Sequence, residues 1–146
     1  MKMKKAMIFY KSRTGITRQL ATNIQKHLGE QGVLAGVKSI EEYVESDIEG
    51  IDFLFLGCWT GGLMVVFQGP ERTWVEFAGR LPRLDGTRTY LFTTYKLLTG
   101  SMFKNMQKHL KFSNAIGQLQ VIKSRNGNLT EEGRELLNEI AADQES

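Results

Sequence analysis

Apolar runs alternate along the chain with segments in which apolar residues recur every three or four positions. Runs of the first kind are typical of strands, and segments of the second kind are typical of helices with one buried face. We expect strands at Ala6–Tyr10, Val33–Val37, Phe53–Gly57, Thr89–Thr93 and Leu119–Ile122. The third run is continuously apolar, which favours a strand covered on both faces. The pattern predicts an α/β chain.

The first two helical segments carry clear end signals. The first presents an apolar face and is expected to stop at Gly29, since glycine is common just past a helix. The second is short and opens at Ser39 with Glu42 three residues on, which is a capping box. The apolar residues are Ile16, Leu20, Ile24 and Leu28 in the first segment and Ile40, Tyr43 and Val44 in the second.

Three further helices are expected. The third begins at Gly69-Pro70, where Pro70 suits a first helical turn. Ser101 and Thr130 are the expected N-caps of the fourth and fifth. The inward positions are Trp74, Phe77, Ala78 and Leu81 in the third, Met102, Met106 and Leu110 in the fourth, and Leu136, Leu137 and Ile140 in the fifth.

Five strand and helix pairs in strict alternation predict a three-layer α/β fold, with a five-stranded parallel sheet and helices on both faces. We expect the strand order 2-1-3-4-5, because the second strand contains Ala35 and Gly36 and is the weakest apolar run, as suits an edge. Ligands of such sheets bind beyond the carboxyl ends of the strands where the order reverses. Three loops are therefore expected at the site: Lys11–Thr17, Cys58–Gly69 and Thr94–Gly100.

The first loop has the chemistry of a phosphate cradle. Backbone N–H groups at a helix start have no partner within the helix, and the helix dipole places positive charge there. Hydroxyls add donors, and Gly15 lets an anion approach the backbone. The glycine spacing excludes both the P-loop and the dinucleotide fingerprint. The alternative is an ordinary strand-to-helix turn with an N-cap. The cradle residues are Ser12, Arg13, Thr14, Gly15, Ile16 and Thr17.

The pattern Ser-x-Thr-Gly-x-Thr follows the apolar run Ile8-Phe9-Tyr10 and precedes Ala21 and Ile24. It resembles the signature of the flavodoxin family. The resemblance implies a flavodoxin-like fold, a single domain over residues 1–146, and FMN as cofactor, its phosphate bound by the first loop. Length and element order agree along the whole chain, but the specific match is confined to Ile8–Ile24.

The resemblance also assigns roles to the other two loops. It implies that Trp59 stacks against the flavin and that a flexible peptide at Gly61-Gly62 faces the flavin N5, while Tyr95 is the second stacking ring. Whether the apolar run Leu63–Phe67 covers the flavin or forms an interface stays open. The implied FMN-binding residues of these loops are Cys58, Trp59, Thr60, Gly61, Gly62, Thr93, Thr94 and Tyr95.

Composition narrows the class of protein. The 146 residues suffice for one core, and the single cysteine, Cys58, cannot form an internal disulfide, which indicates a reducing, cytoplasmic setting. The apolar run after Lys5 is too short for a signal peptide, and nothing approaches a membrane span. His27 and His109 have no second ligand at metal spacing. We expect no metal, no catalytic residue, and no nucleic-acid or membrane partner.

Positive charge gathers near the third loop, although the net charge is only +3. Lys104, Lys108 and Lys111 fall at helical spacing, beyond Lys96. They form either a solvated helix face or a docking surface for acidic redox partner proteins near Lys96, Lys104 and Lys108. Flavodoxins that act as low-potential carriers are typically acidic around the flavin. The basic residues here therefore weaken the expectation of a strongly reducing carrier.

Three functions remain after the sequence is considered. The first is an FMN-binding electron-transfer protein that shuttles single electrons between redox partners, with chemistry supplied by the cofactor. The second is an FMN-dependent NAD(P)H or quinone reductase, in which Arg13, Arg18 and Lys96 bind a nicotinamide phosphate. The third is a flavin-free interaction module, because function does not follow from fold alone. Whether the chain is an enzyme, and its oligomeric state, stay open.

Overall fold

Five parallel strands form the central sheet of the computed structural model, which describes residues 3–63, 66–82, 86–95, 101–110 and 120–142. They are β1 (Lys5–Lys11), β2 (Leu34–Ser39), β3 (Phe53–Trp59), β6 (Arg88–Thr94) and β7 (Gln120–Ser124). Their order is β2-β1-β3-β6-β7, and each neighbouring pair is parallel. Counted along the chain this is 2-1-3-4-5, so the predicted topology is confirmed.

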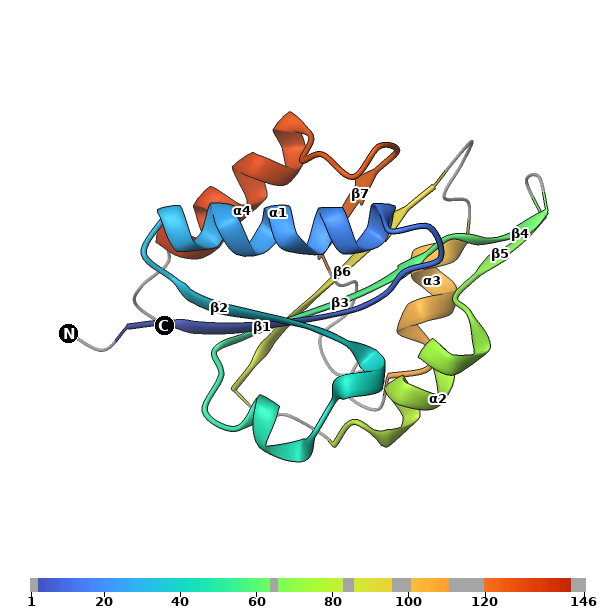
Figure 1. Ribbon diagram of the computed structural model, residues 1–146, viewed down its shortest axis with the longest axis horizontal. Helices are drawn as coiled ribbons and strands as arrows, with labels where there is room; N and C mark the ends of the chain where they lie inside the picture. Colours follow the sequence, from blue (N-terminus) through green and yellow to red (C-terminus); the bar gives the residue numbers. More distant parts are fainter. Residues whose placement is uncertain (1–2, 64–65, 83–85, 96–100, 111–119, 143–146) are drawn as a thin grey trace.

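Helices cover both faces of the sheet (Figure 1). On one face lie α1 (Ile16–Glu30) and α4 (Glu131–Ala142). On the other lie α2 (Arg72–Arg80), α3 (Met102–Gln107) and two short 3₁₀ turns, η1 (Ile40–Glu42) and η2 (Glu45–Ile48). The predicted three-layer α/β arrangement is therefore confirmed.

The core has one apolar cluster on each side of the sheet. Alternate residues of β3 point to opposite sides, so Leu54 packs toward α2 and α3 while Phe55 packs toward α1 and α4. All residues of β3 up to Cys58 are buried, as its continuously apolar sequence predicts. The carboxyl ends of β1, β3 and β6 meet at one edge of this packed sheet.

The ends of two helices differ from expectation. α1 does not stop at Gly29 but continues to Glu30, and the left-handed residue that follows it is Gly32. Ile16 is 37% exposed, and Thr17 takes the inward position in the first turn. α2 begins after Glu71, so Pro70 precedes the helix instead of occupying its first turn. Both boundaries lie one or two residues from the predicted position, within the usual variation of helix ends.

The predicted caps and inward residues are mostly confirmed. Ser39 and Glu42 form the capping box of η1, and the hydroxyl of Thr130 accepts a hydrogen bond from the N–H of Gly133 at 3.0 Å. Ser101 stands at the N-cap position of α3, without a side-chain cap bond. Val44 is exposed, contrary to expectation. The inward residues of α2 (Trp74, Phe77, Ala78, Leu81) and those of the fourth segment (Met102, Met106, Leu110) are buried.

The segment expected to be a long loop after β3 contains a β-hairpin. Strands β4 (Gly61–Leu63) and β5 (Val66–Gly69) pair antiparallel and extend past the edge of the sheet (Figure 1). The expectation of an irregular loop over Cys58–Gly69 was therefore wrong. A run of apolar residues with high strand propensity satisfies its backbone groups by pairing with itself.

One glycine is required by close packing at the centre of the sheet. A Cβ on Gly57 would lie 2.0 to 2.4 Å from three ring atoms of the buried Phe92. We predict that Gly57→Ala lowers the free energy of unfolding by about 3 kcal/mol, because the ring has no free space to enter. Urea unfolding measures the change.

Gly79→Ala is the matched control for this prediction. Gly79 lies in α2, and nothing stands within 4 Å of the Cβ position. The substitution should raise stability by about 0.5 to 1 kcal/mol, since alanine favours a helix over glycine. Equal effects of the two substitutions would contradict the packing argument.

Candidate functional site

The turn between β1 and α1, where the sequence predicts an anion cradle, is open to solvent. The N–H of Gly15 donates to Ser12 Oγ at 2.9 Å, which folds the turn back on itself. Gly15 has φ +93°, a left-handed conformation that residues with a Cβ rarely adopt, and nothing lies within 4 Å of its Cβ position. No side chain of the described chain fills this space.

Four backbone N–H groups of the cradle have no hydrogen-bond partner among the described residues: those of Arg13, Thr14, Ile16 and Thr17. The last two belong to the first turn of α1, where the helix dipole adds positive charge. The Thr14 side chain is exposed beside them, and the Ser12 hydroxyl, which accepts hydrogen bonds from the N–H groups of Gly15 and Arg18, still has its own proton to donate. The arrangement suits a phosphate group.

Thr17 differs from the other cradle residues because its side chain is buried. Its hydroxyl forms a hydrogen bond of 2.5 Å with the hydroxyl of Thr94, the last residue of β6. This contact joins the first turn of α1 to the carboxyl end of a strand 77 residues later. The side chain of Thr17 thus fixes the position of this turn, while its N–H has no hydrogen-bond partner among the described residues.

Threonines at the ends of β3 and β6 form a second buried contact. Thr93 Oγ1 donates to the carbonyl of Cys58 at 2.5 Å, so the 2.8 Å bond between the hydroxyls of Thr60 and Thr93 has Thr60 as its donor. The N–H of Thr60 also donates to the carbonyl of Thr94 at 2.8 Å. These bonds hold the exit of β3 against the exit of β6.

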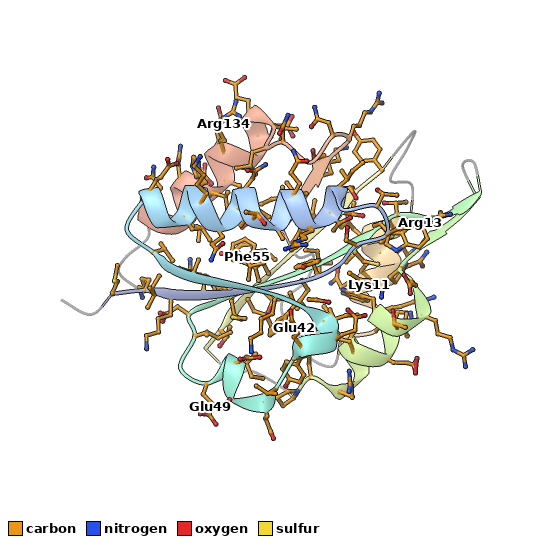
Figure 2. The ribbon with its side chains drawn as sticks, viewed as in Figure 1. Lys11, Arg13, Glu42, Glu49, Phe55 and Arg134 are labelled. Carbon is orange, nitrogen blue, oxygen red and sulfur yellow. The ribbon has the colours of Figure 1, made fainter. Side chains whose placement is uncertain are left out.

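Trp59 ends β3 and is half-buried beside the cradle. Its indole Nε1 donates to Glu71 Oε2 at 2.9 Å, and the guanidinium carbon of Arg13 lies 5.1 Å from the ring centroid. Figure 2 shows Arg13 and Lys11 at the same end of the sheet. A flat ligand stacked on Trp59 must use the other face of the indole or replace the guanidinium.

Cys58 belongs to the core. The side chain is fully buried in the cluster with α2 and α3, and Sγ accepts a hydrogen bond from the N–H of Glu71 at 3.4 Å. Burial disfavours the thiolate and raises the pKa of the Cys58 thiol to about 12. The thiol is thus an unreactive packing group under the site, and of the second loop only Trp59 and Thr60 bring described side chains to the sheet edge.

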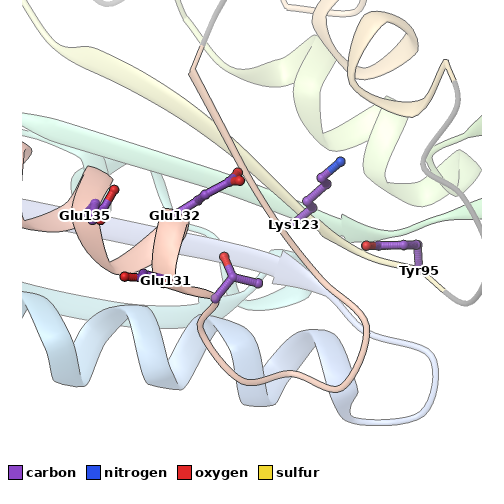
Figure 3. Close-up of a pocket in the computed structure, with 6 residues that line it drawn as sticks. Tyr95, Lys123, Glu131, Glu132 and Glu135 are labelled. Atoms are coloured by element: carbon purple, nitrogen blue, oxygen red, sulfur yellow. The ribbon is translucent and has the colours of Figure 1, made fainter.

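Tyr95 follows β6 on the other side of the site. Its N–H donates to the carbonyl of Ser124 at 3.2 Å, and the guanidinium carbon of Arg125 lies 5.4 Å from the ring centroid. The ring also borders an open hollow of about 500 Å³ at the start of α4 (Figure 3). The other residues lining this hollow are Lys123, Thr130, Glu131, Glu132 and Glu135.

A charged network lies next to the cradle. Lys11 Nζ is 2.7 Å from Glu41 and 3.9 Å from Glu71. The hydrogen bond to Glu41 outweighs burial and raises the pKa of Lys11. Burial acts to raise the pKa of Glu41, but the hydrogen bonds from Lys11 and Ser39 together lower it. Both groups are therefore charged at neutral pH, and they tie the end of β1 to η1 and α2.

The expected basic stripe is only partly described. Lys104 and Lys108 are exposed at α3 and just beyond it. Lys96 and Lys111 lie outside the described residues. Gly61 and Gly62 lie in β4, where the backbone alone is described.

Residues 7–65 match the family model described as a flavodoxin domain. Flavodoxin from Megasphaera elsdenii, solved in its two-electron reduced form, is 23% identical, with 94% of this chain and 98% of that chain covered at a TM-score of 0.68. The fold of the chain is that of the flavodoxins. A flavodoxin from Streptococcus pneumoniae TIGR4 is 18% identical, with 95% and 96% covered at a TM-score of 0.66.

The flavodoxin fold also occurs within larger proteins that are similar to this chain. Rubredoxin:oxygen oxidoreductase from Desulfovibrio gigas is 17% identical at a TM-score of 0.66, with 94% of this chain covered. The flavodoxin-like chain spans about a third of that enzyme, at 34% of its length. No curated protein matches the chain. None of the helices in the described ranges combines the length and apolar content needed to cross a bilayer.

Sequence reasoning missed two groups at the edge of the flavodoxin-like sheet. Glu71 bonds Trp59 from the N-cap position of α2, and its place directly after Pro70 was the available signal. Arg125 reaches Tyr95 from the loop after β7, and no local pattern marks it.

The Thr17–Thr94 hydrogen bond can be tested by a double-mutant cycle. Thr17→Val and Thr94→Val should each cost about 1 to 3 kcal/mol of stability, because each leaves a buried hydroxyl without its partner. The double variant should cost about 1 kcal/mol less than the sum. Thr22→Val, exposed on the same helix, should change stability by under about 0.5 kcal/mol. Additive losses in urea unfolding would show that the two hydroxyls act independently.

The buried thiol predicts a pH dependence. The pKa of Cys58 is raised from 9.0 to about 12, so the folded state keeps its proton while the unfolded thiol ionises above about pH 9. Stability that is present below pH 9 is therefore lost as the pH rises toward 12. Between pH 8 and pH 10 the protein should lose about 1.4 kcal/mol more than Cys58→Ala, measured by urea unfolding. Parallel losses in the two proteins would contradict the burial argument.

Proposed function

We propose that this chain binds FMN and transfers electrons between redox proteins. The observation that carries the proposal is the open cradle between β1 and α1, with four N–H groups that have no partner in the described chain. The cradle stands at the end of β1, beside β3, where the strand order reverses and where ligands of this architecture bind. The flavodoxin domain match over residues 7–65 covers the cradle and β3.

The residues present fit the two chemically different ends of FMN. The phosphate suits the N–H groups of residues 13, 14, 16 and 17 and the hydroxyls of Ser12 and Thr14. The flat ring suits the aromatic side chains of Trp59 and Tyr95, and Thr60, Thr93 and Thr94 fix the backbone between them. FMN, when bound, supplies the electron transfer, and the chain supplies binding, orientation and electrostatics.

Acidic proteins are the proposed redox partners. Lys104 and Lys108 are exposed at α3, the helix that follows the third loop. Complementary charge speeds the encounter of two proteins and orients them.

We also propose that the protein is cytoplasmic, in keeping with its one cysteine, the buried free thiol of Cys58. We propose one domain over residues 1–146, because both core clusters pack against the same central sheet.

The proposal predicts that a negative charge in the cradle weakens FMN binding selectively. Thr14 is exposed, so Thr14→Asp should fold, and its carboxylate repels the phosphate dianion. We expect a loss of about 2 kcal/mol, or roughly thirtyfold in Kd, measured by fluorescence titration of the flavin. The Kd for riboflavin, which has no phosphate, should stay within about twofold.

Ser46→Asp is the control, because it adds the same charge at an exposed residue of η2. It should leave the Kd for FMN unchanged. Failure of the unsubstituted protein to bind FMN, or equal Kd values for FMN and riboflavin, would refute the phosphate assignment.

A further inference from the structure

The indole of Trp59 is held in place by two charged side chains. Glu71 accepts the hydrogen bond of Nε1 at 2.9 Å, in the plane of the ring. Arg13 lies over a face of the ring, 5.1 Å from its centroid. A contact in the ring plane and a contact on a ring face together limit both rotations of the side chain. These two contacts together fix the orientation of the indole at the end of β3.

Glu71 is itself fixed from several directions. Its N–H donates to Cys58 Sγ at 3.4 Å, one residue before Trp59, so backbone and side chain both return to the end of β3. The second carboxylate oxygen, Oε1, accepts from the Thr73 hydroxyl at 2.9 Å and lies 3.9 Å from Lys11 Nζ. Both oxygens are therefore engaged, and the carboxylate has little freedom to release the indole.

We propose that Glu71 is a positioning residue, which sets the orientation of the Trp59 ring for stacking against the flavin. The proposal rests on the function proposed above and names a residue that contacts the stacking ring from outside the three loops. Ordering a free aromatic side chain opposes binding, so a ring that is ordered beforehand binds a flat ligand more tightly. Glu71 acts through Trp59 and takes no part in the redox chemistry.

The test is a double-mutant cycle read out by flavin affinity. Glu71→Ala should weaken binding of both FMN and riboflavin about tenfold, because the ring contact is common to the two ligands. Glu71→Gln keeps a side-chain oxygen for the indole N–H and should stay within about threefold of the unsubstituted protein. In a Trp59→Phe background, which lacks the N–H, Glu71→Ala should add less than about twofold. Glu76→Ala, an exposed glutamate of the same helix, should have no effect.

A second readout needs no ligand. Trp74, the other tryptophan of the chain, is fully buried, so quenching of indole emission by acrylamide reports mainly Trp59. Quenching should increase in Glu71→Ala and stay unchanged in Glu71→Gln and Glu76→Ala. Urea unfolding of each variant, at the same temperature, confirms that the comparison is made on folded protein.

The outcomes separate the two proposals. Equal quenching in all variants, or a loss of affinity from Glu71→Ala that is as large in the Trp59→Phe background, would overturn the positioning role. Absence of flavin binding by the unsubstituted protein would refute the proposed function. If the unsubstituted protein binds no flavin but quenching still increases in Glu71→Ala, then Glu71 orders the indole and has no role in flavin stacking.

Discussion

The bond between the hydroxyls of Thr17 and Thr94 is the contact on which the geometry of the site depends. Buried hydroxyls must find partners, and each of these finds the other. The bond therefore fixes the first turn of α1 relative to the end of β6. Since Tyr95 follows Thr94 directly, the same contact sets the relation between the anion cradle and the third loop. The buried side chain of Thr17 thus fixes the orientation of the backbone N–H groups in the turn between β1 and α1.

Charge at the site is arranged in local pairs. Lys11 is shared by Glu41 and Glu71, and the two guanidinium groups of Arg13 and Arg125 lie over aromatic rings. Each guanidinium thus covers part of one ring face, in the arrangement of a cation–π contact.

Local patterns predicted most of the fold because they depend on periodicity alone. The five strands, the order of the sheet and the inward faces of the helices follow from apolar spacing and strict alternation. The turn between β1 and α1 was predictable because its groups lie within six consecutive residues, and its use as an anion site stays a prediction. The β4–β5 hairpin was not, because its apolar run has no polar turn signal to mark two strands.

No local sequence pattern predicted the long-range contacts at the site. The partners Lys11 and Glu41 are 30 residues apart, and Glu71 comes from yet another element. The order of the strands brings them together, because it places the end of β1 between the ends of β2 and β3. The structural use of the Thr17 hydroxyl likewise depends on which way the first turn of α1 faces in the folded protein.

The hairpin after β3 has a consequence for how its backbone can adapt. Gly61 pairs with Gly69 and Leu63 with Val66, but the register shifts between these two pairs, which leaves Gly62 outside the regular ladder. An irregularity of this kind disrupts the ladder locally while the residues on either side stay paired. Because a peptide outside regular pairing has fewer cross-strand bonds to break, we expect a change of backbone orientation at Gly62 to disturb the described strands of the hairpin least.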